Sequence, residues 1–214
     1  MILIDNYQTI LRELIPYHAS LVAVSKTKPI DDILELMNHG QLIFGENYVQ
    51  ELIEKQNEIK NAEWHFIGHL QTNKVKQISG ICNLIHSIDS IKLLKQINQE
   101  AEKQNRIQSC LLQVHIAEEE TKFGFASDEV FKLVDGGEIN QLKNISVKGL
   151  MGMASLSDDE SKIKKEYKTL RKLFENFMTD NFSILSMGMT GDYKIALAEG
   201  STMVRIGSAI FGSR

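Results

Sequence analysis

Cysteine and proline are scarce in this chain, and long hydrophobic runs are absent. The 214 residues include two cysteines and two prolines. Cys82 and Cys110 form no C-x-x-C motif, so the sequence predicts neither a disulfide framework nor a zinc site and fits a reducing compartment. No apolar run approaches the roughly 18 residues that a membrane-spanning helix needs, and the first residues lack the features of a secretion signal. We therefore expect a cytoplasmic protein with no membrane partner and no metal site.

An excess of positive charge is also missing. The formal net charge is -4 and the pI about 5.9, so no basic field is present that would hold nucleic acid. A local basic pocket for a small anion stays compatible with these values. The length and the 43% hydrophobic content suit one domain with a sizeable core, or at most two small ones. Because no Ser/Gly-rich linker marks a boundary, we expect a single domain over residues 1–214. We also expect the protein to be a monomer.

Strand-like and helix-like segments alternate after a helical start. Apolar residues at helical spacing predict a helix over Ile2–His18, and we expect residues 1–19 to pack on the rest of the domain. Eight short apolar segments resemble strands buried on both faces: Leu21–Ser25, Gln41–Phe44, Trp64–Ile67, Leu84–Ile88, Cys110–Ile116, Val147–Met151, Ser183–Met187 and Met203–Ile206. This alternation predicts an α/β fold, a (β/α)8 TIM-type barrel with an extra N-terminal helix. An open doubly wound sheet is the alternative, although no G-x-G-x-x-G follows the first strand.

The ends of the last two predicted strands favour an anion site. Sites in such barrels lie at the carboxyl ends of the strands, and phosphate sites usually follow strands seven and eight. The segments there are SMGMTGD (Ser186–Asp192) and RIGSA (Arg205–Ala209), which are rich in glycine and hydroxyl groups. Glycine lets the backbone approach an anion, and free N–H groups at a helix start bind phosphate oxygens. Gly188 and Gly207 could each be an ordinary turn glycine, but two matching loops favour phosphate.

Two basic residues occupy apolar strand contexts. In LVAVSKTKP (Leu21–Pro29), alternation places Val22, Val24 and Lys26 on one face. If the valines point into the barrel, the amine does too, and a desolvated neutral lysine can attack an aldehyde. A solvated strand end is the alternative for Lys26. Arg205 in MVRIG needs an acceptor, which would be a carboxylate of a neighbouring strand, a ligand's ring nitrogen or a phosphate.

Seven motifs occur in a fixed order from about Leu21 to the last residue. They are LVAVSKTKP, FGENYVQE (44–51), WHFIGHLQTNK (64–74), TKFG (121–124), KGLMGMA (148–154), SMGMTGD (186–192) and EGSTMVRIGSAIFG (199–212). Together they resemble the pyridoxal phosphate homeostasis protein family. The fold of that family is similar to the barrel domain of alanine racemase (fold type III), which supports the predicted barrel.

The resemblance implies pyridoxal phosphate as the cofactor and partner, held as a Schiff base on Lys26. By the same resemblance, Ser186 and the backbone at Met187, together with Gly207 and Ser208, bind the phosphate, and Arg205 faces the pyridine nitrogen. The complete set of expected cofactor-binding residues is Lys26, Asn47, His65, Met151, Ser186, Met187, Arg205, Gly207 and Ser208.

The resemblance implies a protein of cofactor homeostasis, which buffers pyridoxal phosphate or delivers it to apo-enzymes. We expect no catalytic residue and no efficient catalysis. Arg205 cannot keep the pyridine nitrogen protonated as a carboxylate does, and we expect no second, β-rich domain that would supply a tyrosine base. A weak amino-acid racemase is the main alternative, and a barrel binding another phosphorylated metabolite is a third. His69 and Thr190 depart from the proline and serine common in the family.

Overall fold

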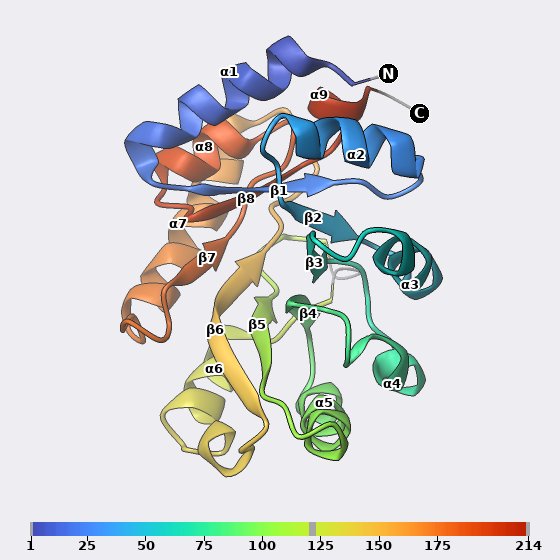
Figure 1. The fold of residues 1–214 in the computed structure, drawn as a ribbon. Helices are drawn as coiled ribbons and strands as arrows, with labels where there is room; N and C mark the ends of the chain where they lie inside the picture. The colour runs from blue at the N-terminus through green and yellow to red at the C-terminus, as the bar shows by residue number, and fades with distance from the viewer. Residues whose placement is uncertain (1, 120–122, 213–214) are drawn as a thin grey trace.

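Eight parallel strands close into a barrel in the order in which they occur in the chain (Figure 1). The computed structural model describes residues 2–119 and 123–212. The strands are β1 Ser20–Val24, β2 Ile43–Glu46, β3 Glu63–Phe66, β4 Leu84–Ile88, β5 Gln108–Val114, β6 Ile145–Gly152, β7 Ile184–Ser186 and β8 Met203–Ile206. The barrel closes through β1 and β8, where Leu21 is opposite Val204 and Val22 is opposite Arg205. The predicted barrel is therefore confirmed, and the open sheet was wrong.

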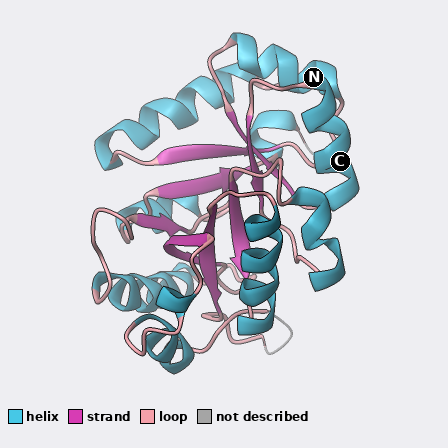
Figure 2. Cartoon of the chain, turned by 60° about the horizontal axis from the view of Figure 1, so that its bottom comes forward, coloured by secondary structure: helices cyan, strands magenta, loops and turns pink. Residues whose placement is uncertain are grey.

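Helices follow the strands and surround the barrel (Figures 1 and 2). They are α1 Ile4–Leu14, α2 Ile30–Asn38, α3 Val49–Glu58, α4 Val75–Ile78, α5 Ile91–Lys103, α6 Ser127–Val134, α7 Glu160–Glu175, α8 Tyr193–Ala198 and α9 Ser208–Phe211, with 3-10 turns at Ile15–Tyr17, Thr72–Lys74 and Ile139–Gln141. Asp159 starts α7 by accepting the N–H groups of Ser161 and Lys162, which satisfies donors that a helix start leaves free. No helix of the described residues is long and apolar enough to cross a membrane.

Apolar side chains pack on both faces of the strands. A large cluster fills the layer between strands and helices and includes Trp64, Phe66 and Ile85. A second cluster lies on the opposite face, inside the barrel, and consists of Val22, Leu84, Leu111, Met151 and Met203. Because both faces are covered, the strands consist of short apolar runs rather than of alternating polar and apolar residues.

The N-terminal helix is shorter than the predicted Ile2–His18. It ends at Leu14, where a 3-10 turn over Ile15–Tyr17 that contains Pro16 takes over, and His18 adopts a left-handed conformation, φ 50°. The helix lies against α9, where the Leu3 N–H donates to the Ile210 carbonyl over 2.8 Å. The two ends of the chain therefore lie side by side (Figure 1).

The strand boundaries largely match the predictions. β4 and β8 have the predicted bounds, and most of the others differ by one or two residues. The second strand was placed too early: it spans Ile43–Glu46 rather than Gln41–Phe44. Gln41 is buried before the strand and its side-chain amide donates to the carbonyls of Leu21 and Ile43. Gln41 is therefore buried as a strand residue would be, although it lies before the strand.

Candidate functional site

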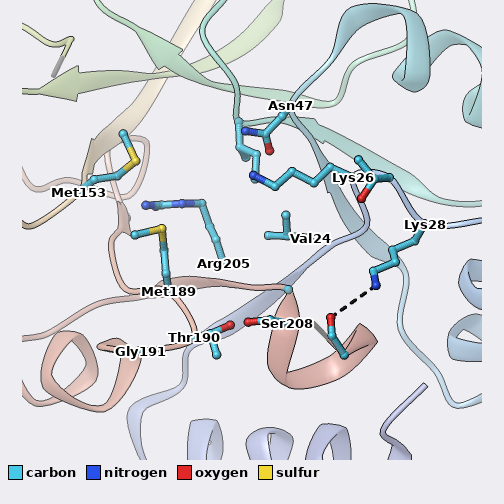
Figure 3. Close-up of a pocket in the computed structure, with 14 residues that line it drawn as sticks. Val24, Lys26, Lys28, Asn47, Met153, Met189, Thr190, Gly191, Arg205 and Ser208 are labelled. Carbon is cyan, nitrogen blue, oxygen red and sulfur yellow. Dashed lines mark hydrogen bonds between the residues drawn. The ribbon is translucent and has the colours of Figure 1, made fainter. Parts of the chain in front are cut away.

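A cavity of about 390 Å³ opens at the carboxyl ends of the strands, where it lies within the range of about 300–1,000 Å³ common for small-molecule sites (Figure 3). Its described lining consists of Val24, Lys26, Thr27, Lys28, Asn47, Ile67, Met153, Met189, Thr190, Gly191, Arg205, Gly207, Ser208 and Gly212. Lys26, Lys28 and Arg205 are the ionisable side chains of this lining, and none of the described lining residues is a carboxylate. The cavity therefore suits an anion.

Lys26 reaches this cavity from the end of β1. Val22 lies inside the barrel, and Val24 and Lys26 line the cavity above it, as the alternation of side chains along a strand predicts. The second lysine of the motif is differently engaged. The Lys28 amine donates to the Phe211 carbonyl over 2.9 Å and to the Gly212 carbonyl over 3.4 Å (Figure 3), so it holds the C-terminal end of α9.

Asn47 follows β2 and faces the same cavity (Figure 3). Its Oδ1 atom is buried and has no hydrogen-bond partner among the described residues. Buried polar atoms are normally paired, so this amide marks a place where a ligand group would fit. Gly68 makes the position of Asn47 possible, because a Cβ atom at Gly68 would lie 2.1 Å from the Asn47 carbonyl oxygen.

Arg205 is buried at the base of the cavity. Its guanidinium donates to the Ser186 carbonyl over 2.9 Å, to the Ser186 hydroxyl over 2.7 Å and to the Gly152 carbonyl over 3.2 Å. Burial lowers the pKa of Arg205, against the opposing effect of Tyr167 and Asp192. No carboxylate of the described residues forms an ion pair with it, so the acceptors on the protein side are neutral. Because a guanidinium has five N–H groups, two are not used by these three acceptors, and Arg205 belongs to the cavity lining.

Two histidines continue this hydrogen-bonded string into the barrel. The Ser186 hydroxyl lies 3.1 Å from His86 Nδ1, and His86 Nε2 lies 3.0 Å from His65 Nδ1. Burial lowers the pKa of His65 to about 4 and the pKa of His86 well below its usual range, so both are neutral at pH 7. Arg205 can only donate, so the serine hydroxyl accepts from it. The tautomer of His86 sets the direction of the Ser186–His86 and His86–His65 hydrogen bonds together, because a neutral imidazole donates from one nitrogen and accepts at the other. The string fixes the position of Arg205.

Asp192 shapes the loop after β7. One carboxylate oxygen accepts the Met189 N–H over 2.6 Å, and the other accepts the Tyr167 hydroxyl over 2.7 Å. This arrangement presents Thr190 and Gly191 to the cavity opposite Ser208 (Figure 3). A Cβ atom added at Gly191 would meet no atom within 4 Å. Bare backbone therefore faces the cavity at a position where packing does not require glycine.

The structure brings together five of the predicted site residues and places four elsewhere. Lining the cavity are Lys26, Asn47, Arg205, Gly207 and Ser208. Ser186 and His65 lie beneath it in the hydrogen-bonded string, and Met151 lies inside the barrel. Met187 packs in the outer core, and its N–H donates to the Met203 carbonyl over 3.2 Å, so that N–H is already engaged.

Sequence reasoning missed His86, Asp192, Met153 and Met189. His86 had a visible signal, because it interrupts the apolar strand LIHSI as Arg205 interrupts MVRIG. Thr121 and Lys122 of the TKFG motif lie outside the described residues. Within the described residues, no group of three potential metal ligands occurs.

Comparisons with known proteins identify relatives of this chain. The family model described as "Alanine racemase, N-terminal domain" matches residues 3–214. Proteins named pyridoxal phosphate homeostasis protein are similar to the chain. The protein from Vibrio alginolyticus is 40% identical over 208 residues, 93% of this chain and 88% of that protein. The human protein is 38% identical over 221 residues, 95% of this chain and 79% of that protein.

Solved structures show the same fold. PipY of Synechococcus elongatus PCC7942, solved with PLP bound, has a TM-score of 0.88 and 31% identity over 97% of this chain and 99% of PipY. An alanine racemase of Clostridium difficile 630 has a TM-score of 0.77 and 14% identity over 98% of this chain and 56% of the racemase. The second likeness concerns the barrel fold alone.

Proposed function

The chain belongs to the pyridoxal phosphate homeostasis protein family, and from this premise we propose that it binds pyridoxal phosphate in the 390 Å³ cavity and serves the intracellular homeostasis of that cofactor. One observation carries the proposal. Lys26, two residues after β1, and Arg205 of the adjacent strand β8 line one cavity together with the backbone at Gly191 and the Gly207–Ser208 turn. Figure 3 shows Lys26, Arg205, Gly191 and Ser208 around it.

The residues present fit each part of the cofactor. The Thr190–Gly191 segment and the start of α9 offer backbone N–H groups and hydroxyls, which suit phosphate oxygens. The two N–H groups of Arg205 that the protein acceptors leave over suit a neutral ring nitrogen, which is an acceptor. The unpartnered Oδ1 atom of Asn47 suits a hydrogen-bond donor on a substituent of the ring.

Lys26 is the residue that we propose to attach the cofactor covalently. When bound, pyridoxal phosphate supplies an electrophilic aldehyde and a ring that can accept electrons. Lys26 is half-buried in the lining of the cavity, and it matches the lysine that carries the cofactor in the family. The Lys28 amine donates to the Phe211 carbonyl at the end of α9. We therefore assign the attack on the aldehyde to Lys26.

We propose that the protein stores and delivers the cofactor rather than catalysing with it. A guanidinium cannot share a proton with the ring as a carboxylate does, so carbanion chemistry gains little stabilisation from Arg205. Among the described lining residues, neither a tyrosine nor a histidine is present to move a second proton. Transfer to apo-enzymes, a monomeric state and a cytoplasmic location belong to the same proposal.

An absorbance spectrum tests the attachment. The purified protein with pyridoxal phosphate should show a near-violet band that borohydride removes, and peptide mapping should place the reduced label on Lys26. Lys26→Ala should lose the band while the matched Lys28→Ala variant keeps it. A band that survives in Lys26→Ala would contradict the assignment.

Isotope exchange tests the absence of efficient catalysis. Alanine or serine incubated with the loaded protein in deuterium oxide should exchange its α-hydrogen no faster than with free cofactor. Faster exchange that Lys26→Ala abolishes would establish the weak racemase instead.

A further inference from the structure

Lys26 sits in a strained turn. The turn spans Ser25 to Lys28 and is closed by the Lys28 N–H, which donates to the Ser25 carbonyl over 3.0 Å. Thr27, the third residue, has φ 63°. Turns that need a positive φ at this position usually carry glycine or asparagine, and a β-branched residue in that conformation is strained. Such a conformation persists only where its surroundings impose it.

A buried ammonium group holds this turn from the side of helix α3. Lys55 of α3 is 4% exposed. Its amine donates to the Ser25 carbonyl over 2.7 Å, to Glu46 Oε1 over 2.8 Å and to Glu51 Oε1 over 2.7 Å. An ammonium group has three N–H donors, so all three are used. We call Ser25, Glu46, Glu51 and Lys55 the Lys55 clamp.

The two carboxylates of the Lys55 clamp accept hydrogen bonds from the residues on either side of Lys26. Glu51 Oε1 also accepts the N–H of Thr27, the residue after Lys26. Glu46 Oε1 also accepts the Ser25 hydroxyl, from the residue before Lys26, over 2.6 Å. Both neighbours of Lys26 are thus tied to one buried ion cluster, while Lys26 itself belongs to the cavity lining.

The Lys55 clamp contributes nothing to the cavity wall by its own side chains, because none of its four residues lines the cavity. Burying such a cluster is costly: desolvation raises the pKa of Glu46 to about 7 although Lys55 opposes the rise, and Glu46 Oε2 has no partner among the described residues. A buried cluster of this kind is weak evidence for stability. Its contacts with the turn suggest a role in the geometry of Lys26.

We propose that the Lys55 clamp is a positioning device that imposes the strained turn and thereby presents Lys26, rather than Lys28, as the reactive amine of the cavity. The proposal rests on the proposed function, since it concerns which lysine attacks the aldehyde. Glu46, Glu51 and Lys55 are positioning residues: they act through the backbone at Ser25 and Thr27.

Competition between the two lysines tests this proposal. Wild type, Glu51→Ala, Glu51→Gln and the control Glu54→Ala are treated with pyridoxal phosphate and borohydride, and peptide mapping gives the rate and the ratio of label on Lys26 and Lys28. Glu54 is on the same helix but accepts from Gln50, outside the clamp, so Glu54→Ala should match wild type.

Glu51→Ala should slow labelling of Lys26 about tenfold and raise the share on Lys28, because a hydrogen bond to a charged acceptor is worth at least about 1.5 kcal/mol. Glu51→Gln keeps an acceptor for the Thr27 N–H, so its ratio should lie between those of wild type and Glu51→Ala. Amide exchange at Thr27 in the cofactor-free proteins should accelerate in the same order, a readout that does not depend on the cofactor.

The outcomes separate the two proposals. If wild type carries no label on Lys26, the proposed function fails. If wild type is labelled on Lys26 but Glu51→Ala and Glu51→Gln match Glu54→Ala in rate, ratio and Thr27 exchange, the positioning role is overturned. Should Glu51→Ala not fold, Glu51→Gln decides alone: wild-type values in all three readouts would overturn the role, and a shift toward Lys28 would support it.

Discussion

At the scale of single residues, Gly191 is the place where bare backbone faces the cavity. Its φ is not in the left-handed region and a Cβ atom there would meet no protein atom within 4 Å. Neither strain nor packing therefore explains the glycine, whereas a ligand phosphate close to the backbone would.

Gly191→Ala should consequently weaken pyridoxal phosphate binding without lowering stability. We expect the Kd to rise at least about tenfold, because a methyl group in contact with the phosphate costs more than about 1.4 kcal/mol. Fluorescence titration gives the Kd and urea unfolding gives the stability. Unchanged affinity would place the phosphate elsewhere in the cavity.

His86 is the residue that links the arginine to the barrel interior. His86→Leu removes a hydrogen-bond partner of the Ser186 hydroxyl and the partner of His65 Nδ1, so two buried polar groups each lose a hydrogen bond. We expect a loss of about 1–3 kcal/mol in the free energy of unfolding for each group left unpaired, measured by urea denaturation. His86→Gln, which can still bond on both sides, should lose less; equal losses would argue against the string.

At the scale of elements, the loop between β7 and α8 depends on one carboxylate. Asp192→Ala removes the acceptor of the Met189 N–H and of the buried Tyr167 hydroxyl. The segment that presents Thr190 and Gly191 should loosen, and the Kd for pyridoxal phosphate should rise about tenfold. Asp192→Asn keeps an oxygen acceptor for Met189 and an amide partner for Tyr167. The Kd of Asp192→Asn for pyridoxal phosphate should stay at the wild-type value or fall below it. If both variants raise the Kd equally, the negative charge of Asp192 and not its hydrogen bonds would be what the loop requires.

Elements also show what the sequence could and could not predict. Short apolar runs and their number predicted the barrel, because strands covered on both faces carry that pattern. The predicted start of β2 at Gln41 was wrong. This side chain is buried before the strand, where its amide donates to backbone carbonyls, and such tertiary contacts are not visible in a local sequence pattern. Alternation along β1 predicted the direction of Lys26 correctly, since it depends only on local geometry. The partners of Ser186 and Lys55 come from other strands and helices, and no local pattern contains them.

At the scale of the whole molecule, buried ionisable groups give the stability two opposing dependences on pH. His65 has a pKa of about 4 in the folded protein against about 6.5 unfolded. Its unfolded form therefore binds a proton first, and stability is lost as pH falls from about 6.5 to 4. Glu46, with a folded pKa raised to about 7, has the opposite effect, because its stabilising contribution is lost as pH rises from about 4.5 to 7.

Variants should separate these two effects. Relative to wild type, His65→Gln should gain stability as pH falls from 7.5 to 4, by at most roughly 3 kcal/mol. Glu46→Gln should gain relative to wild type as pH rises over the range of about 4.5 to 7. Urea unfolding at a series of pH values measures both differences, and a difference that does not change with pH would show that the group concerned titrates normally.

The packing of α1 on α9 has a consequence for the molecule as a whole. Helix α9 starts at Ser208, which lines the cavity. Near its end, the Phe211 carbonyl accepts from the Lys28 amine and the Ile210 carbonyl accepts from the N–H of Leu3, the residue before α1. The cavity and the contact between α1 and α9 therefore share one element. If cofactor binding stabilises the packing of α1 on α9, reciprocity requires that this packing stabilises cofactor binding by the same free energy. Limited proteolysis within α1 or α9 should therefore report occupancy: digestion there should slow as the cofactor is added, and a clipped protein should release its cofactor sooner.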